Sequence, residues 1–168
     1  MALTTELYLK LTGNLTGTAD LVTPSAALLL ANFTTMTSGT GDHAADLMWS
    51  DTRTLTASST EDLDLAGSLS PHVGTGTLTF ARIKLLYVAA AAANTNNVNV
   101  IRPASNGVPL FLAAGDGIPV KPDGKFIWVA PDATGIAVTA STGDLITFTN
   151  SSSGTSVTYD VVIIGASA

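Results

Sequence analysis

The strongest constraint on the fold is a succession of short strand-like segments separated by turn residues. Thr and Val recur along the chain, and Gly, Pro, Asn and Asp interrupt the sequence roughly every 8 to 12 residues. Thr5–Leu11 alternates, so that every second residue is a leucine. Helical periodicity is scarce, and an α/β fold would need helices. The pattern predicts an all-β, single-domain β-sandwich or jelly-roll-like antiparallel fold.

The individual strands can be placed from alternation and from apolar runs. A turn is expected at Gly13 and Asn14, and a loop over most of Ala114–Gly124. Leu28–Met36 reads as a strand or a short helix, with a strand favoured. The final strand is expected deep in a sheet, so trimming it should unfold the protein. Further strands are expected over Leu47–Ala57, Glu61–Leu69, Leu78–Ala90, Val98–Ile101, Val108–Ala113, Phe126–Ala130, Ile136–Ala140, Leu145–Thr149 and Val157–Ile164.

Length and composition limit the organisation. The 168 residues fit one domain, 1–168, with residues 1–20 as a candidate extended N-terminal arm. Only 12% of the residues are charged, against about 25% in typical soluble domains. A surface so poor in charge favours a homo-oligomer, in which other copies cover part of it.

The charges and apolar runs also bear on partners. Seven basic against thirteen acidic residues, without a Lys/Arg cluster, argue against nucleic acid. No run approaches the ~20 apolar residues that span a bilayer, so no membrane partner is expected. The start of the chain lacks the pattern of a signal peptide, which predicts synthesis in the cytoplasm of the producing cell.

Candidate chemistry is sparse. His43 and His72 lie in Gly-rich loops, with Asp42, Asp46 and Asp51 near the first. They could form a metal or acid–base site, but a solvated loop is favoured because no ligand spacing repeats. No cysteine, G-x-S-x-G, S-x-x-K or nucleotide-binding motif is present. We therefore predict no enzyme activity, no catalytic residue, no cofactor and no metal, and leave interface residues unknown.

Other polar and aromatic residues receive structural interpretations. Glu61, Asp62 and Asp64 lack the EF-hand pattern, and a solvated strand face is favoured over calcium binding. Asp51 should lie on the same strand face as Arg53 and could pair with it, although a subunit contact would satisfy the charge equally well. A sugar-binding platform is conceivable for the tryptophans and tyrosines, but core or rim packing is favoured for Trp49, Trp128, Tyr8, Tyr87 and Tyr159.

Several motifs in the last hundred residues resemble small β-sandwich virion proteins of tailed phages and prophages, of the capsid decoration or cement type. The family pattern has Gly-Gly after the proline of its P-x-G element, whereas this chain has Asp123-Gly124, a change that a turn tolerates. The motifs are structural, and they transfer no catalytic residue. They stand at Asp64–Leu69, Leu78–Lys84, Asn94–Asn96, Pro122–Gly124 and Tyr159–Gly165.

The resemblance implies a function for the whole chain. It implies a structural virion protein on the capsid surface that stabilises the head by bridging capsomers, with the major capsid protein as partner and a trimer favoured. The alternative is a tail, baseplate or fibre-associated β-domain that binds glycans or a host surface through exposed aromatic residues.

Overall fold

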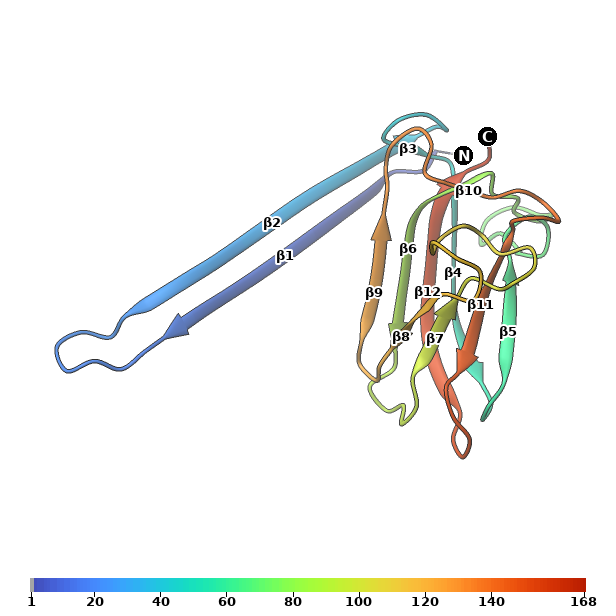
Figure 1. The fold of residues 1–168 in the computed structure, drawn as a ribbon. Helices are drawn as coiled ribbons and strands as arrows, with labels where there is room; N and C mark the ends of the chain where they lie inside the picture. The colour runs from blue at the N-terminus through green and yellow to red at the C-terminus, as the bar shows by residue number, and fades with distance from the viewer. Residues whose placement is uncertain (1) are drawn as a thin grey trace.

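The computed structural model describes residues 2–168, and this part of the chain contains no helix (Figure 1). No segment of it is therefore a helix long and apolar enough to cross a membrane. The all-β prediction is confirmed. The strands are β1 (Thr5–Thr16), β2 (Ser25–Ser38), β3 (Ala44–Ala45), β4 (Leu47–Leu55), β5 (Thr60–Asp64), β6 (Arg82–Ala90), β7 (Val98–Ile101), β8 (Gly117–Val120), β9 (Lys125–Val129), β10 (Ile136–Ala137), β11 (Leu145–Asn150) and β12 (Val157–Ala166).

Two sheets pack face to face to form the sandwich. One has the order β10-β6-β12-β4, with β9 also paired to β6, and the other has the order β5-β11-β7-β8. Strands of both sheets alternate side chains between the interior and the outside. Residues from both inner faces form one apolar core, in which the rings of Phe148 and Tyr159 stack with centroids 4.7 Å apart. This architecture is a β-sandwich.

The last strand lies in the middle of its sheet, as its apolar sequence predicts. β12 pairs with β4 on one side and with β6 on the other. Val161 and Ile163 are fully buried. Gly165 lies where the strand register shifts, and a Cβ there would come within 2.0 Å of the Arg82 carbonyl oxygen. Close backbone approach therefore requires glycine at this position.

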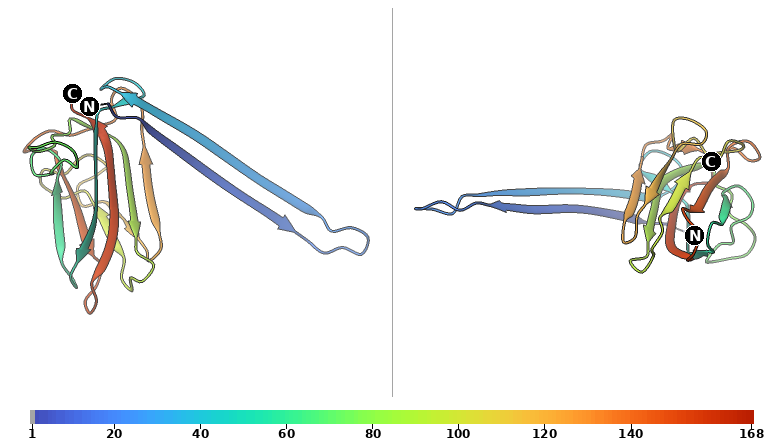
Figure 2. Two further views of the ribbon diagram at one scale, coloured as in Figure 1. Left: turned by 180° about the vertical axis from the view of Figure 1, so that it is seen from behind. Right: turned by 60° about the horizontal axis from the view of Figure 1, so that its bottom comes forward.

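The N-terminal region leaves the sandwich as a long antiparallel hairpin. β1 and β2 pair continuously from Thr5 opposite Met36 to Thr16 opposite Ser25. Figures 1 and 2 show this hairpin, which we call the arm, pointing away from the sandwich in every view. The sequence suggested an extended arm over residues 1–20, whereas the projecting segment also includes most of the return strand β2, up to the buried Met36 at its root.

The expected turn at Gly13 and Asn14 is wrong. Both residues continue the β1 ladder, opposite Leu28 and Ala27, and the chain reverses only beyond Thr16. The backbone N–H of Gly17 donates to the carbonyl of Pro24 at 2.9 Å and closes the loop. Gly13 has no positive φ and continues the extended backbone of β1.

Two expectations between residues 108 and 124 are also wrong. Val108–Ala113 is a loop, where the Arg102 guanidinium donates to the carbonyl of Phe111 at 2.9 Å. Gly117–Val120, expected as loop, is strand β8. β8 is the edge of its sheet, and an edge strand tolerates Pro119, which has no N–H to donate.

Candidate assembly surface on the projecting arm

The arm has two chemically different faces, fixed by its register. Directly opposed residues share a face, so odd positions of β1 lie with even positions of β2. The other face carries Tyr8 and Phe33 together with the charged Glu6 and Lys10. The first face, which we call the apolar arm face, consists of Thr5, Leu7, Leu9, Leu11, Gly13, Leu15, Ala26, Leu28, Leu30, Asn32, Thr34 and Met36, none of them charged.

Most of the apolar arm face is exposed to solvent. Leu11 and Leu28 are each 54% exposed, and Leu15 near the tip is 77% exposed. An isolated two-stranded hairpin is only marginally stable in water. Contiguous apolar surface of this kind marks an interaction site in a soluble protein. The geometry therefore identifies the apolar arm face as the candidate functional surface.

The root of the arm is packed on the sandwich. Met36 is fully buried and forms a small second core with Ala45, Leu85 and Ile164. Leu3 and Leu7 pack against this cluster. Beyond the root, β2 makes a short parallel pairing with β3. The arm therefore begins from a fixed base, although most of its length has no cover within the chain.

A buried lysine holds the chain that leads out of the arm. Lys84 is fully buried, and its Nζ donates to the carbonyl of Gly41 at 2.9 Å and to that of Asp132. The backbone N–H of His43 donates to the Pro131 carbonyl at 2.8 Å. These bonds join the loop after β2 to the loop after β9 and to β6. Lys84 thus fixes the arm root to the sandwich.

Burial and the neighbouring carboxylates act on the pKa of Lys84 in opposite directions. Burial lowers the pKa of Lys84, and Arg82 lowers it further, whereas Asp132 and Asp42 act in the other direction. The Asp132 carboxylate accepts hydrogen bonds from the side chain and backbone of Thr134 and from the Gly135 backbone, which lower its pKa to about 2. The ionised Asp132 thereby supplies a negative charge close to the buried ammonium.

A second polar cluster ties the two sheets together on the sandwich. Arg53 of β4 donates from Nη2 to Glu61 Oε2 of β5 at 2.6 Å, and from Nη1 to Asp51 Oδ2 at 2.9 Å. The buried Tyr159 hydroxyl of β12 donates to Glu61 Oε1 at 2.6 Å. Of the two alternatives that the sequence left open for Arg53, the ion pair with Asp51 is present. Glu61 is the partner that the sequence did not reveal, because it lies on the other sheet.

The pKa values in this cluster follow from its contacts. Burial alone would raise the pKa of Glu61, but the hydrogen bonds from Arg53 and Tyr159 and the charge of Arg53 outweigh burial and hold the pKa below its usual value. Burial, and then the hydrogen bond to Glu61, raises the pKa of Tyr159. The solvated face expected for Glu61 is thus wrong, because this carboxylate is bound by Arg53 of β4 and Tyr159 of β12, both in the facing sheet.

The other candidate polar residues are dispersed over the fold. His43 Nδ1 lies 3.1 Å from Asp42 Oδ2 at an exposed loop, whereas His72 Nε2 lies 3.1 Å from both the backbone N and the Oγ of Ser50. Asp46 accepts hydrogen bonds from Ser167. Within residues 2–168, no group of three or more His, Asp or Glu residues is arranged to hold a metal ion.

Asp62 and Asp64 do not form a joint site. The Asp62 carboxylate accepts a hydrogen bond from the Thr147 hydroxyl at 2.5 Å. Asp64 accepts one from the backbone N–H of Ala66 at 2.8 Å. The first contact joins the middle of β5 to β11, and the second stabilises the turn that follows β5.

The aromatic residues are mostly packed in the sandwich, as expected. Trp49 is 5% exposed and Tyr159 is 1% exposed, while Trp128 and Tyr87 are half-buried. Tyr8 departs from the expectation, because it lies on the arm and is 61% exposed. Its strand was identified correctly, but the arm carries it away from the core.

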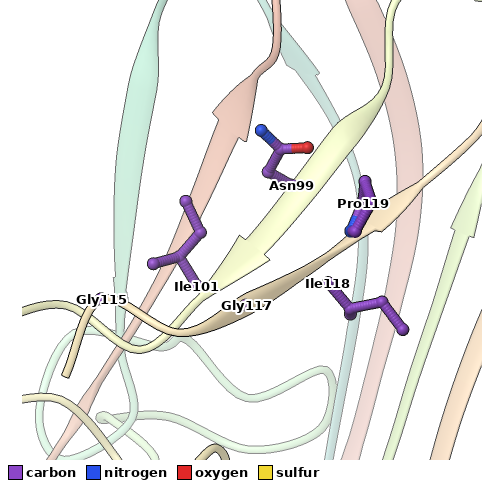
Figure 3. A pocket seen from close by; sticks show the side chains of 6 residues that line it. All are labelled: Asn99, Ile101, Gly115, Gly117, Ile118 and Pro119. Carbon is purple, nitrogen blue, oxygen red and sulfur yellow. The ribbon is translucent and has the colours of Figure 1, made fainter. Parts of the chain in front are cut away.

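An open depression lies beside the paired strands β7 and β8. Figure 3 shows Asn99, Ile101, Ile118 and Pro119 around it, with Gly115 and Gly117 in the adjoining backbone. None of these six residues is titratable. The depression therefore offers packing surface but no acid, base or nucleophile.

Sequence reasoning detected the signal for the arm without recognising its meaning. The alternation of Leu7, Leu9 and Leu11 was visible, but alternation alone does not tell a covered face from an uncovered one.

Comparisons with protein-family models, with curated proteins and with solved structures found no match for this chain.

Proposed function

We propose that this protein is a structural virion component, a capsid decoration or cement protein that stabilises the head by bridging capsomers. The observation that carries the proposal is the apolar arm face, which is exposed along a rigidly rooted hairpin. A domain that works alone gains nothing from such a surface, whereas a protein that joins subunits needs one. The sequence resemblance to phage decoration proteins supports the same role.

The dimensions of the arm suit bridging. Twelve residues of β1 extend for ~40 Å at the usual rise of a strand. The sandwich can therefore sit on one capsid subunit while the arm reaches across to the neighbouring subunit, where a further copy of the protein can receive the apolar arm face. Specific contacts need about 800 Å² per partner, and many symmetric copies on one shell multiply modest individual affinities.

The polar groups inside the sandwich form hydrogen bonds that hold the fold together, which is in line with a structural role. Glu61 is bound by Arg53 and Tyr159, and Lys84 is bound by backbone carbonyls. These groups stabilise the fold through the contacts they make. On this proposal the protein is made in the host cytoplasm, occupies the capsid surface, binds the major capsid protein and forms a homo-oligomer.

Particles with and without the protein test the proposal. Heads that lack it should release DNA at a lower temperature than complete heads, and adding the purified protein should restore the higher temperature. A variant with Leu9, Leu11 and Leu30 all replaced by Thr should restore it poorly. Unchanged heat stability, together with absence of the protein from purified heads, would refute the capsid role.

The tail or fibre alternative rests on exposed aromatic residues that bind glycans. Trp49, one of the two tryptophans available for this role, is buried in the core. A sugar could not stack on it without opening the sandwich. Finding the protein in purified tails but not in heads would favour that alternative.

A further inference from the structure

A second apolar surface lies on the outside of the sandwich. Side chains of β6, β9, β12 and β4 that point away from the core come together at the end of the sheet nearest the arm root. Met48 is 45% exposed and Ile127 is 39% exposed. We call this surface the outer sheet patch. It consists of the exposed Met48 and Ile127, the half-buried Tyr87, Val129 and Val162, and Leu85 and Ile164, which are buried in the cluster at the arm root.

Within one chain, the two apolar surfaces already meet at their ends. Leu7 and Met36 belong to the apolar arm face, and both pack in the cluster that contains Leu85 and Ile164 of the outer sheet patch. Beyond this root the arm leaves the sandwich (Figures 1 and 2). Leu9 is 47% exposed and Ile127 is 39% exposed. Within one chain, therefore, only the residues at the root of the apolar arm face contact the outer sheet patch.

We propose that the apolar arm face of one copy lies across the outer sheet patch of a second copy, so that the protein assembles by exchange of arms. The donor and the acceptor surface are on the same chain, which makes a second copy the simplest partner that fits both. Repeated around a symmetry axis, such a contact closes into a pair or a ring.

The charges are arranged as this contact requires. The charged residues of β1, Glu6 and Lys10, lie on the opposite arm face and would remain in water. On the outer sheet face, the charged Lys125 and Asp160 lie at the end far from the arm root, both opposite Ala89. The contact would therefore bury no charge, which would otherwise be costly.

The area of the contact is limited by the acceptor surface. A two-stranded ribbon ~40 Å long and ~10 Å wide presents about 400 Å² on one face. The free part of the outer sheet patch is smaller, because Leu85 and Ile164 are already buried at the arm root. Exchange of two or more arms around a closed assembly repeats the contact and adds to the buried area. The inference concerns the isolated protein and does not depend on the capsid role.

The oligomeric state of the purified full-length protein gives the first test. We expect light scattering and sedimentation to show a dimer or a trimer at micromolar concentration. Replacing Leu9, Leu11 and Leu30 together by Thr should weaken association at least a hundredfold while leaving the sandwich folded, since all three are exposed. Threonine keeps the strand propensity of the arm.

The opposite arm face provides a matched control. Tyr8, Leu29 and Phe33 are 61%, 69% and 59% exposed, so they are at least as accessible as the three leucines. Replacing them together by Thr should leave the oligomer nearly unchanged. A monomeric wild-type protein, or equal losses in both triple variants, would overturn the proposal.

Disulfide trapping tests the acceptor surface directly. The chain has no cysteine, so Leu11→Cys and Ile127→Cys can be introduced without competing thiols. Subunits with only the first change, mixed with subunits that carry only the second, should form a reducible cross-link between chains. The Leu29→Cys subunit, paired with Ile127→Cys, should cross-link at least tenfold less.

The trapping experiment also separates other occupants of the arm. In a double variant, a disulfide within one chain would mean that the arm folds back on its own sheet. Cross-links between two Leu11→Cys chains, without any to Ile127→Cys, would mean that arms pair with arms. Binding of a monomer to lipid vesicles would point to a membrane surface. Each of these results overturns arm exchange between copies, and the capsid role would remain to be judged from the particles.

Discussion

The arm and the sandwich are built from the same local pattern but differ in what covers them. Leu9 and Leu11 on the arm are 47% and 54% exposed, whereas Leu63 and Leu65 in the sandwich are 3% and 0% exposed. Both pairs alternate with polar residues; Leu9, Leu11 and Leu63 lie in strands, and Leu65 directly follows β5. The difference teaches that alternation specifies a strand with one apolar face, and that a second layer must supply the burial.

The two regions should also differ in how they respond to mutation. Sandwich side chains lie among neighbours from both sheets, so a change there alters the free energy of unfolding of one chain. Arm side chains beyond the root, such as Leu11 and Leu15, are more than half exposed. Changes on the apolar arm face should therefore act on association, and their effect should depend on protein concentration.

The largest contrast is expected between two identical substitutions. Leu65→Ala should lower the free energy of unfolding by about 2–5 kcal/mol, because it leaves a cavity in a closed core. Leu9→Ala should change it by less than about 0.5 kcal/mol in the dilute monomer. Urea unfolding followed by the fluorescence of Trp49 and Trp128 measures both. Equal effects would show that the arm is packed in the free chain.

The next effect concerns the junction between the two regions. Lys84→Met should cost about 1–3 kcal/mol, because the carbonyls of Gly41 and Asp132 lose their buried donor. Hydrogen exchange should quicken at residues 37–46 and 131–135 more than in β12. A uniform increase over the whole chain would mean that Lys84 supports the global fold rather than the arm root.

A smaller, pH-dependent effect is expected for the cluster of Arg53, Glu61 and Tyr159 that joins the two sheets. The pKa of Glu61 is lowered on folding, so its ionised form stabilises the protein above the unfolded value of about 4.5. That contribution is lost as the pH falls through the folded pKa. Glu61→Gln should therefore cost roughly 1 kcal/mol at pH 7 and progressively less below about pH 4. If the two proteins differed in free energy of unfolding by the same amount at every pH, the stabilising role of the ionised Glu61 carboxylate would be contradicted.

The smallest effect on the sandwich should follow the largest deletion. Residues 9–32 can be replaced by an Asn-Gly turn, because Tyr8 and Phe33 lie directly opposite each other. The free energy of unfolding of the monomer should change by less than about 0.5 kcal/mol, since the root residues remain. Association should be lost. Collapse of the sandwich would show that the arm stabilises it directly.

Sequence patterns located most strands but not their partners. The run from Leu85 to Ala90 is apolar at nearly every position and forms the buried half of β6, and the last apolar run forms the central strand β12. The errors arose at glycine and proline, which occur both in turns and in strands. Glycine and proline often mark turns. Here Gly13 continues the β1 ladder, and Pro119 lies in the edge strand β8, where a missing N–H is tolerated.

The candidate site was less predictable than the fold. Asp51 and Arg53 are two residues apart, so their pairing follows from strand periodicity. Glu61 joins them from another sheet, and Lys84 meets carbonyls of two distant loops. Such contacts join positions far apart in the chain, which local periodicity does not relate to one another.

By itself, the sequence determined that this protein is built from strands with distinct apolar faces, because alternation and turn residues act over a few neighbouring positions. The tertiary structure alone decided which apolar faces are covered. It encloses Leu63 and Leu65 between two sheets and leaves Leu9 and Leu11 on a projecting ribbon. The physical reason is that burial depends on the layer packed above a face, and that layer comes from residues distant in the chain or from another copy.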